Sequence, residues 1–371
     1  MRTMKAALAC VMGITVMTLA VWNGPQTVDD FRSFYTAAEL ASSHRSVYSQ
    51  PAIAPDASGE QTFLPYIRIP SYAAALAPLT RLPYSTARRI WMGLQLLALA
   101  VCVWLMPGNR ARAAIALAFS VPVAYTFVLG QDIGLVLLIV MTAAALASRE
   151  RDFLAGLAAS LICIKISYLP AVGLVFAAKS RRGLLGFVTG VTAQMAGSFA
   201  VAGSRWPFEY LALLRNPLLD LEPRRMLSVR AITTSLSLPD VVFVAGILVL
   251  FAFLWWAAKR ITLAGALLVA LPLAVVSSPH CYIYDAVVFI PLLVHVANLT
   301  SWSGVLAVLA LTSIPYLALM SESAPGLLAG CALLIAAVLA ATVTFSKQKK
   351  TAPTAPAPPL QVVFTGSPVL K

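Results

Sequence analysis

Long apolar stretches recur along the whole of this sequence, and they constrain its fold more than any other feature. Of the 371 residues, 60% are hydrophobic and only 11% are charged, and the mean hydropathy is +0.85. Many stretches approach about 20 residues, the length that carries a helix across a bilayer. Because a soluble domain is less apolar than this, we predict an all-α polytopic membrane protein.

The hydropathy profile predicts one transmembrane unit over residues 1–346. The expected spans cover 7–23, 84–106, 111–129, 133–147, 184–202, 239–257, 262–277, 282–298, 302–320 and 326–345. The basic start and apolar core of the first 23 residues also fit a signal peptide, but no clear A-x-A cleavage site follows, so we expect a retained helix. The tail, residues 347–371, is rich in Pro and Ala and is predicted to be a disordered cytoplasmic extension.

Residues 153–178 decide the topology. A single straight helix of this length would run about 39 Å, which is longer than a hydrocarbon core of about 30 Å, and it would bury Lys165 near the costly midplane. A hairpin of two short helices, 153–164 and 168–178, instead places every short basic loop on the side of the N-terminus. We therefore predict a hairpin, about 12 crossings and both termini in the cytoplasm.

Two long outer segments, 24–83 and 203–238, are not expected to span the membrane. The spacing of Phe31, Phe34, Tyr35 and Ala38 suits a short helix that lies in the membrane interface. The second segment is basic and aromatic. We predict that its interfacial helices wall a cavity.

The first outer segment opens with two adjacent acids, Asp29 and Asp30, in a chain with few others. A carboxylate at a membrane surface can remove a proton from a hydroxyl beside a lipid-borne leaving group. The alternative is structural, because Asp before an apolar run often caps a helix. The pair by itself does not separate these two interpretations.

Arginine gathers on the predicted outer side, where it indicates that an anionic phosphate group is handled. The candidates for contact with that phosphate are Lys165, His280, Arg68, Arg224 and Arg225. Contact with lipid headgroups and snorkelling are the alternative for each arginine. The alternative for Lys165 is snorkelling at a helix turn, and that for His280 is a capping or core position. Asp285 either lines the cavity or pairs with Lys165 or an arginine, and we favour the pair. Gln131 and Asp132 follow Gly130 and either touch a sugar or cap the next helix.

The cysteines and histidines give no metal signature. The cysteines all lie in apolar runs without CxxC spacing and are read as core residues; they are Cys10, Cys102, Cys163, Cys281 and Cys331. None of the three histidines is paired with a second at ligand spacing. We expect neither a metal site nor a cofactor.

An ordered set of short motifs resembles glycosyltransferase family 87 over roughly residues 5–345. The set begins with Asp30-Phe31 and Tyr35, continues through Tyr48, the stretch 63–70, APLTRLP, ARRIW and Gly130-Gln131, and ends with an AG...IK...P run and SPHCYIYD. Each motif is short, and their order and spacing carry the resemblance. The family's Tyr-Pro-Pro stretch is replaced here by YIRIPS, and its glycine before the loop tyrosine is missing around residues 43–45.

The resemblance implies a GT-C fold with an active site at the outer membrane face. It also implies transfer of a hexose, with mannose expected, from a polyprenyl-phosphate donor to a glycolipid or glycan acceptor. The transfer would invert the anomeric carbon without a metal. The family's loop acid maps onto Asp30, with Asp29 as runner-up, and Tyr35 in the same motif is expected to contact substrate. The implied location is the bacterial cytoplasmic membrane. The protein is expected to contact the lipid bilayer and not to bind nucleic acid.

Two other classes of function remain open from the residues alone. A flippase or secondary transporter would place ionisable groups near the midplane and often shows inverted repeats. The ionisable residues here crowd one face, and no repeat is visible, which favours the enzyme. An envelope-polymer ligase or polymerase would also use polyprenyl-linked substrates, and the arginines of 203–238 keep that class open.

Overall fold

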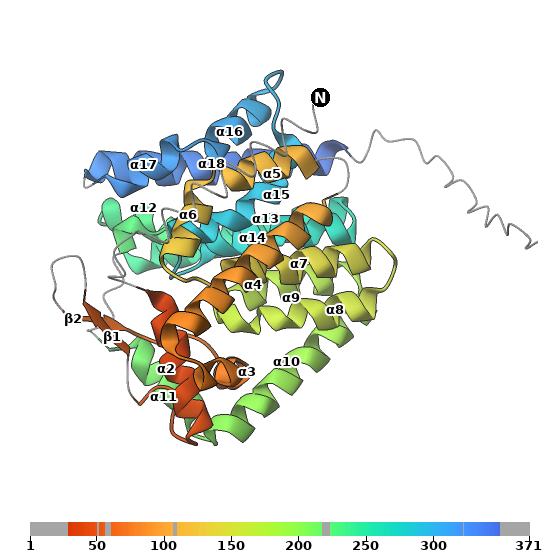
Figure 1. Ribbon diagram of the computed structural model, residues 1–371. Helices are drawn as coiled ribbons and strands as arrows, with labels where there is room; N and C mark the ends of the chain where they lie inside the picture. Colours follow the sequence, from red (N-terminus) through yellow and green to blue (C-terminus); the bar gives the residue numbers. More distant parts are fainter. Residues whose placement is uncertain are drawn as a thin grey trace, which may run out of the picture.

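The computed structural model describes residues 29–49, 52–55, 61–106, 110–216, 223–321 and 323–348. The expected first helix at 7–23 and the tail beyond residue 348 lie outside these ranges. The described part is mostly helical (Figure 1). This architecture agrees with the predicted class, a polytopic helical membrane protein.

The long helices follow the predicted spans closely. They are α4 (Tyr84–Trp104), α7 (Ile133–Ala147), α10 (Arg181–Ala202), α13 (Asp240–Arg260), α14 (Leu263–Ser277) and α18 (Ala324–Gln348). Helix α14 is apolar on all sides and is almost wholly buried, in contact with α7, α9 and α13. A helix that is hydrophobic all round belongs in the interior of a bundle.

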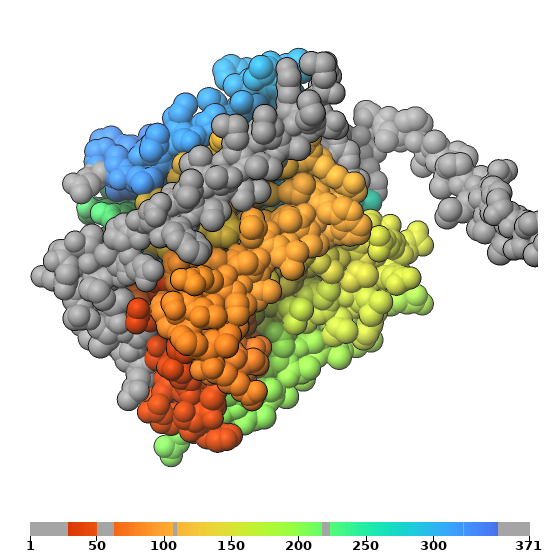
Figure 2. Space-filling model, viewed as in Figure 1, coloured from red at the N-terminus to blue at the C-terminus, as the bar shows by residue number. Residues whose placement is uncertain are grey.

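Helices on the outside of the bundle expose large apolar side chains. Leu97 on α4 is 59% exposed, Leu185 on α10 is 62% exposed and Leu248 on α13 is 65% exposed. Figure 2 shows the surface of α4 as a band across one face of the molecule. Apolar patches of this kind fit a surface that meets lipid.

Two predicted spans are broken helices. The expected span 111–129 is divided into α5 (Arg110–Ala118) and α6 (Val121–Val128), which are bent by 57°. The expected span 302–320 is divided into α16 (Trp302–Leu311) and α17 (Ile314–Met320), bent by 54°. Each second helix carries a proline in its first turn. Proline lacks the N–H that a continuous helix would need there, which explains the position of both breaks.

The predicted hairpin is present. It consists of α8 (Asp152–Ser160), a 3-10 segment η2 (Leu161–Tyr168) and α9 (Leu169–Lys179). The Ser180 hydroxyl donates to the Asp152 carboxylate over 2.5 Å, so the two ends of the segment meet. A straight helix would separate them by about 42 Å. The chain turns at Lys165, whose φ of −120° and ψ of 85° are not helical.

Fewer helices qualify as membrane spans, judged by length and composition, than the 12 crossings predicted from the sequence. Among the described residues, five helices are long and apolar enough to cross a membrane, or seven if each bent pair is one span. That count treats residues 152–179 as one span, although their ends meet. Twelve crossings therefore stay a prediction.

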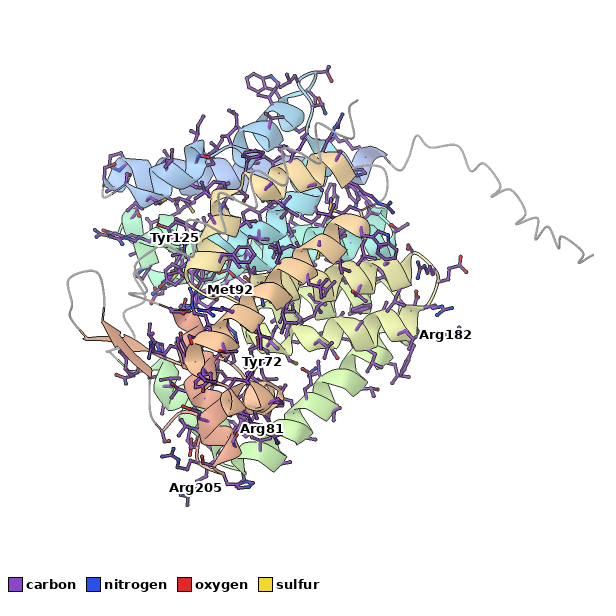
Figure 3. The ribbon with its side chains drawn as sticks, in the orientation of Figure 1. Tyr72, Arg81, Met92, Tyr125, Arg182 and Arg205 are labelled. Carbon is purple, nitrogen blue, oxygen red and sulfur yellow. The ribbon has the colours of Figure 1, made fainter. Side chains whose placement is uncertain are left out.

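The two segments that were predicted to lie outside the membrane form a small layer at one end of the bundle. It contains α2 (Asp30–Ser42), the antiparallel strands β1 (Ala52–Pro55) and β2 (Gln61–Leu64), α3 (Pro70–Leu76) with the 3-10 turn η1 (Ala77–Arg81), α11 (Trp206–Leu214), the 3-10 turn η3 (Pro223–Arg225) and α12 (Val229–Ser235). In Figure 1, α2, α3, α11 and the strands lie at the end opposite the α7–α8 and α9–α10 turns. Figure 3 marks the two ends by Arg81 and Arg205 on one side and Arg182 on the other.

Helix α2 is present as predicted, but its apolar face is not at the surface. Phe31 and Phe34 are buried, and their rings contact Trp91 of α4. The helical spacing of the apolar residues correctly predicts the helix. Its partner is the protein itself, because α3 and α4 cover the apolar face.

The hairpin predicts the labelling of two loops. With the five native cysteines replaced by alanine, Arg151→Cys and Lys179→Cys should react with a membrane-impermeant maleimide from the same side. The reason is that the two ends of the hairpin meet. Labelling in right-side-out and inverted vesicles measures this directly.

Arg205→Cys serves as the matched control, because α10 separates it from residue 181 by one candidate span. It should be labelled from the opposite side. Labelling of positions 151 and 179 from opposite sides would contradict the hairpin.

Candidate active site

The start of α2 lies against the turn between α6 and α7. The Asp30 N–H donates to the Leu129 carbonyl over 2.8 Å. Gly130 in this turn has a φ of +66°, and a Cβ added there would come within 2.3 Å of the Asp29 carboxylate and 2.7 Å of Phe31. The backbone can approach this closely because glycine has no side chain and tolerates positive φ.

Asp29 is fully engaged in holding this junction. Its carboxylate accepts hydrogen bonds from the Phe31 N–H at 3.1 Å and the Tyr84 hydroxyl at 2.8 Å. It also forms an ion pair with Arg88. The residue is therefore the N-cap of α2, as the structural interpretation of the acid pair predicts.

Asp30 is held more loosely. Among the described residues, only the Gln131 amide donates to its carboxylate, and no cation forms an ion pair with it. The pKa of Asp30 is raised to about 6, chiefly because burial disfavours the charged form. Gln131 and Arg68 lower this pKa, whereas Asp29 and Asp132 raise it.

Arg68 and Asp132 form a buried pair next to Asp30. The guanidinium donates through Nε over 2.8 Å and through Nη2 over 3.0 Å, one bond to each carboxylate oxygen. Burial alone would raise the pKa of Asp132, but Arg68 outweighs it and the pKa is lowered. Burial likewise opposes the charge of Arg68, and Asp132 outweighs it and raises that pKa. Both groups are therefore ionised.

A second buried ion pair joins the 3-10 segment η2 to another 3-10 segment, η4 (Ile283–Phe289). Lys165 at the turn of η2 binds Asp285 in η4, which precedes α15 (Ile290–Val296). The Tyr168 hydroxyl also donates to Asp285, over 2.8 Å, and the Tyr282 N–H donates to its second oxygen over 2.9 Å. Lys165 lies near the rings of Tyr168 and Tyr284. Asp285 is thus the partner of Lys165, as the sequence indicates.

His280 lies in the loop between α14 and η4, within the electrostatic reach of both pairs. Burial lowers the pKa of His280 to about 4; Asp285 opposes this shift, and Lys165 and Arg68 add to it. The imidazole is therefore neutral at neutral pH. It can exchange hydrogen bonds with a phosphate or a hydroxyl, but it does not add a positive charge to the site.

Three other predicted residues lie outside this cluster. The Tyr35 hydroxyl donates to the Leu82 carbonyl over 2.8 Å, which ties α2 to the chain after η1. Arg224 and Arg225 are exposed in η3. This turn is joined to the His280 loop by the N–H of Leu227, which donates to the Cys281 carbonyl over 3.4 Å. Substrate contact by these three residues stays a prediction.

The site also contains residues that the sequence did not single out. Tyr84 and Arg88 complete the environment of Asp29, and Tyr168 completes that of Asp285. Tyr168 follows Lys165 by three positions, the spacing of neighbours on a helical turn, which is the only local signal. Within the described ranges, no three His, Cys, Asp or Glu side chains gather as they would around a metal ion.

Four acids lie at one end of the protein, and they differ in the groups that bind their carboxylates. Asp29, Asp132 and Asp285 each accept bonds from a cation, and Asp29 and Asp285 accept from a tyrosine as well. Asp30 has an amide as its donor and a raised pKa. Of these four carboxylates, Asp30 is the one suited to take up a proton near neutral pH.

The contact at Gly130 predicts a stability change. Gly130→Ala should lower the free energy of unfolding by about 1 kcal/mol or more, because alanine is strained at positive φ and its Cβ would displace the Asp29 carboxylate. Thermal unfolding of the purified protein in detergent measures the change.

Gly93→Ala in α4 is the matched control, since a Cβ there would meet no heavy atom within 4 Å. It should leave the melting temperature unchanged or slightly higher. Equal melting temperatures for Gly130→Ala and the parent would show that the turn does not need glycine.

Comparison with known proteins identifies the family. Residues 69–279, more than half of the chain, match the model of glycosyltransferase family 87. No curated protein and no solved structure matches the chain. The matched segment includes Gln131, Asp132 and Lys165 and leaves Asp30 and His280 outside, so it does not by itself assign the roles of those two. The chain belongs to glycosyltransferase family 87 and is a membrane glycosyltransferase.

Proposed function

We propose that this protein transfers a hexose, mannose, from a polyprenyl-phosphate donor to an envelope glycolipid or glycan. The transfer takes place at the outer face of the bacterial cytoplasmic membrane and inverts the anomeric carbon. Asp30 is the general base. Family membership supports sugar transfer, and the geometry around Asp30 supports the assignment of the base.

One observation carries the proposal: Asp30 is the acid of the cluster without an ion pair among the described residues. A general base needs a free lone pair and a pKa near the working pH. Asp30 has both, because Gln131 is its donor and burial raises its pKa to about 6. Asp29, fixed by Arg88 and Tyr84 beside it, is the residue that keeps α2 in place.

The reaction then follows from the charges present. The acceptor hydroxyl oxygen attacks the anomeric carbon as its proton passes to Asp30. The bond from that carbon to the phosphate oxygen breaks, and the polyprenyl phosphate leaves with the electron pair. Attack opposite the leaving group inverts the configuration. Negative charge grows on the departing phosphate, so cations beside it stabilise the transition state.

Lys165 and Arg68 are the cations best placed for that role. Each is buried and bound to one carboxylate, which holds it in position before substrate arrives. Ammonium has three donors, and Asp285 takes one of them from Lys165. The donor phosphate is thus a further acceptor for a cation that is already oriented. Arg224 and Arg225, exposed in η3, are proposed to meet the phosphate at the rim of the site.

Two buried polar atoms support a sugar beside Asp30. Gln131 Oε1 and His280 Nδ1 are buried and have no hydrogen-bond partner within the described part of the chain. A buried polar atom without a partner is costly. Sugar hydroxyls would satisfy both atoms, so we assign Gln131 and His280 to sugar or phosphate contact.

The orientation is proposed from charge. The basic loops at 148–152 and 179–182 lie together at the end opposite α2 (Figure 3). Basic loops favour the cytoplasmic side. The site then faces outward, where a polyprenyl-linked sugar is presented.

Substitution of Asp30 tests the assignment. Asp30→Asn should lower kcat for mannose transfer by about 10²- to 10⁴-fold, because the variant has no base. The assay uses purified protein in nanodiscs with radiolabelled polyprenyl-phosphate-mannose and a membrane acceptor fraction. Asp29→Asn should instead lower the melting temperature and retain transfer well above that of Asp30→Asn, because Arg88 loses its carboxylate.

Full activity of Asp30→Asn would move the base elsewhere. Movement of the labelled lipid across proteoliposomes without cleavage of its sugar bond would favour a transporter over a transferase.

The rate should also depend on pH through the same carboxylate. A base with a pKa of about 6 is ionised above that pH, so transfer should fall about tenfold per unit as the pH drops below it. Initial rates from pH 4.5 to 8 measure the profile. A profile that is flat down to pH 5 would contradict a base with a raised pKa.

A further inference from the structure

The turn at residues 129–132 contacts the start of α2 through both backbone and side chains. Leu129 accepts the Asp30 N–H, and the Gly130 carbonyl accepts the Trp91 indole N–H over 2.8 Å. The next residue, Gln131, donates to the Asp30 carboxylate. The turn is therefore anchored on two elements and aims one amide at Asp30.

The last residue of the turn, Asp132, binds a side chain from the first long segment, Arg68. Asp132 is the N-cap position of α7, but its carboxylate makes no cap hydrogen bond. Both of its oxygens bind Arg68, whose guanidinium also lies 5.4 Å from the centre of the Phe34 ring. A bidentate pair between a planar guanidinium and a carboxylate fixes both partners. Asp132 thus sets where the charge of Arg68 lies.

We propose that Gln131 and Asp132 are positioning residues for Asp30. Gln131 holds its carboxylate directly, and Asp132 fixes Arg68 beside it while offsetting the arginine charge. Gln131 thus also serves the base, besides its proposed sugar contact. The inference rests on the proposed function only in taking Asp30 as the base; the two contacts themselves are independent of the reaction.

The two residues act on the proton of Asp30 in opposite directions. Gln131 stabilises the ionised carboxylate, so its loss favours the protonated form. Asp132 cancels part of the charge of Arg68, so its loss favours the ionised form. Among the described residues, Asp29 at the N-cap of α2 and Tyr284 from η4 also interact electrostatically with Asp30, and neither substitution removes them.

The test compares pH–rate profiles of single variants. Gln131→Met keeps the length of the side chain and removes the donor, and it should move the acidic inflection of kcat up by about one pH unit. Asp132→Asn keeps the shape and leaves Arg68 uncompensated, and it should move the inflection down by a similar amount. A residue that merely supported the fold would lower the rate at every pH alike.

Asp132→Asn leaves a buried cation without its carboxylate, and such a change can prevent folding. The double variant Arg68→Gln, Asp132→Asn removes both charges and avoids this problem. Because Arg68 acts more strongly on Asp30 than Asp132 does, its inflection should lie at or above that of the parent. A direct effect of the Asp132 charge would give the same reversal between the single and double variants, so the single variant Arg68→Gln completes the comparison. If Asp132 acts through Arg68, adding Asp132→Asn to Arg68→Gln should move the inflection by less than Asp132→Asn moves it in the parent.

A second readout does not need the reaction. A carboxyl whose pKa is raised in the folded protein costs stability when it ionises, so that cost is absent below the unfolded pKa and complete above the folded one. The melting temperature of each background is compared with that of the same background carrying Asp30→Asn. The pH at which the difference reaches its plateau should move up in Gln131→Met and down in Asp132→Asn.

Opposite shifts in this thermal readout support the inference. Shifts of the same sign, or no shift in either variant, overturn it. If no variant and no parent transfers sugar while the thermal shifts are opposite, the proposed function fails and the positioning of Asp30 stands.

Discussion

Two buried ion pairs hold together the end of the protein where the transfer is proposed to take place. Arg68 with Asp132 joins the first outer segment to α7, and Lys165 with Asp285 joins the hairpin turn to η4. Breaking either pair would strand a charge in a medium that solvates it poorly. Each pair also brings together residues that are more than 60 positions apart in the chain. The positions of Asp30, Gln131 and His280 depend on this framework.

The pairing has a chemical consequence for the site. Lys165 and Arg68 are each paired with a carboxylate but keep further N–H donors, which in the proposed mechanism bind the donor phosphate. Asp30 is different, because its partner is an amide and its charge is not offset by direct contact. In the proposed mechanism the acids therefore have separate roles: three fix structure, and Asp30 exchanges a proton.

Much of the helical architecture was predictable from hydropathy. The bounds of α4, α7, α10, α13 and α14 lie within a few residues of the predicted spans, and the hairpin was predicted from the length of 153–178, Lys165 and the basic loops. The strands β1 and β2 were not predicted, because the segment around them carries Pro, Ser and Asp typical of a loop. The breaks at Pro122 and Pro315 were missed as well, since the hydropathy stays high across both.

The site was less predictable than the fold. The sequence placed Asp30, Lys165, Gln131 and Arg68 among the candidates, and favoured Asp285 as the partner of either Lys165 or an arginine. It did not assign Arg68 to Asp132 or Arg88 to Asp29, because such pairs depend on how distant helices meet. It also could not show that burial keeps His280 neutral. Local spacing cannot report desolvation, which is set by the whole packed end.

The hairpin of α8 and α9 has a consequence for how the chain enters the membrane. Its two ends meet at Asp152 and Ser180, so this segment returns to the side from which it started. Insertion of α10 and all later helices is therefore independent of whether the hairpin has already entered the bilayer. Lys165 at its tip lies 120 positions before its counter-ion Asp285, so the pair forms only after the later helices have been made.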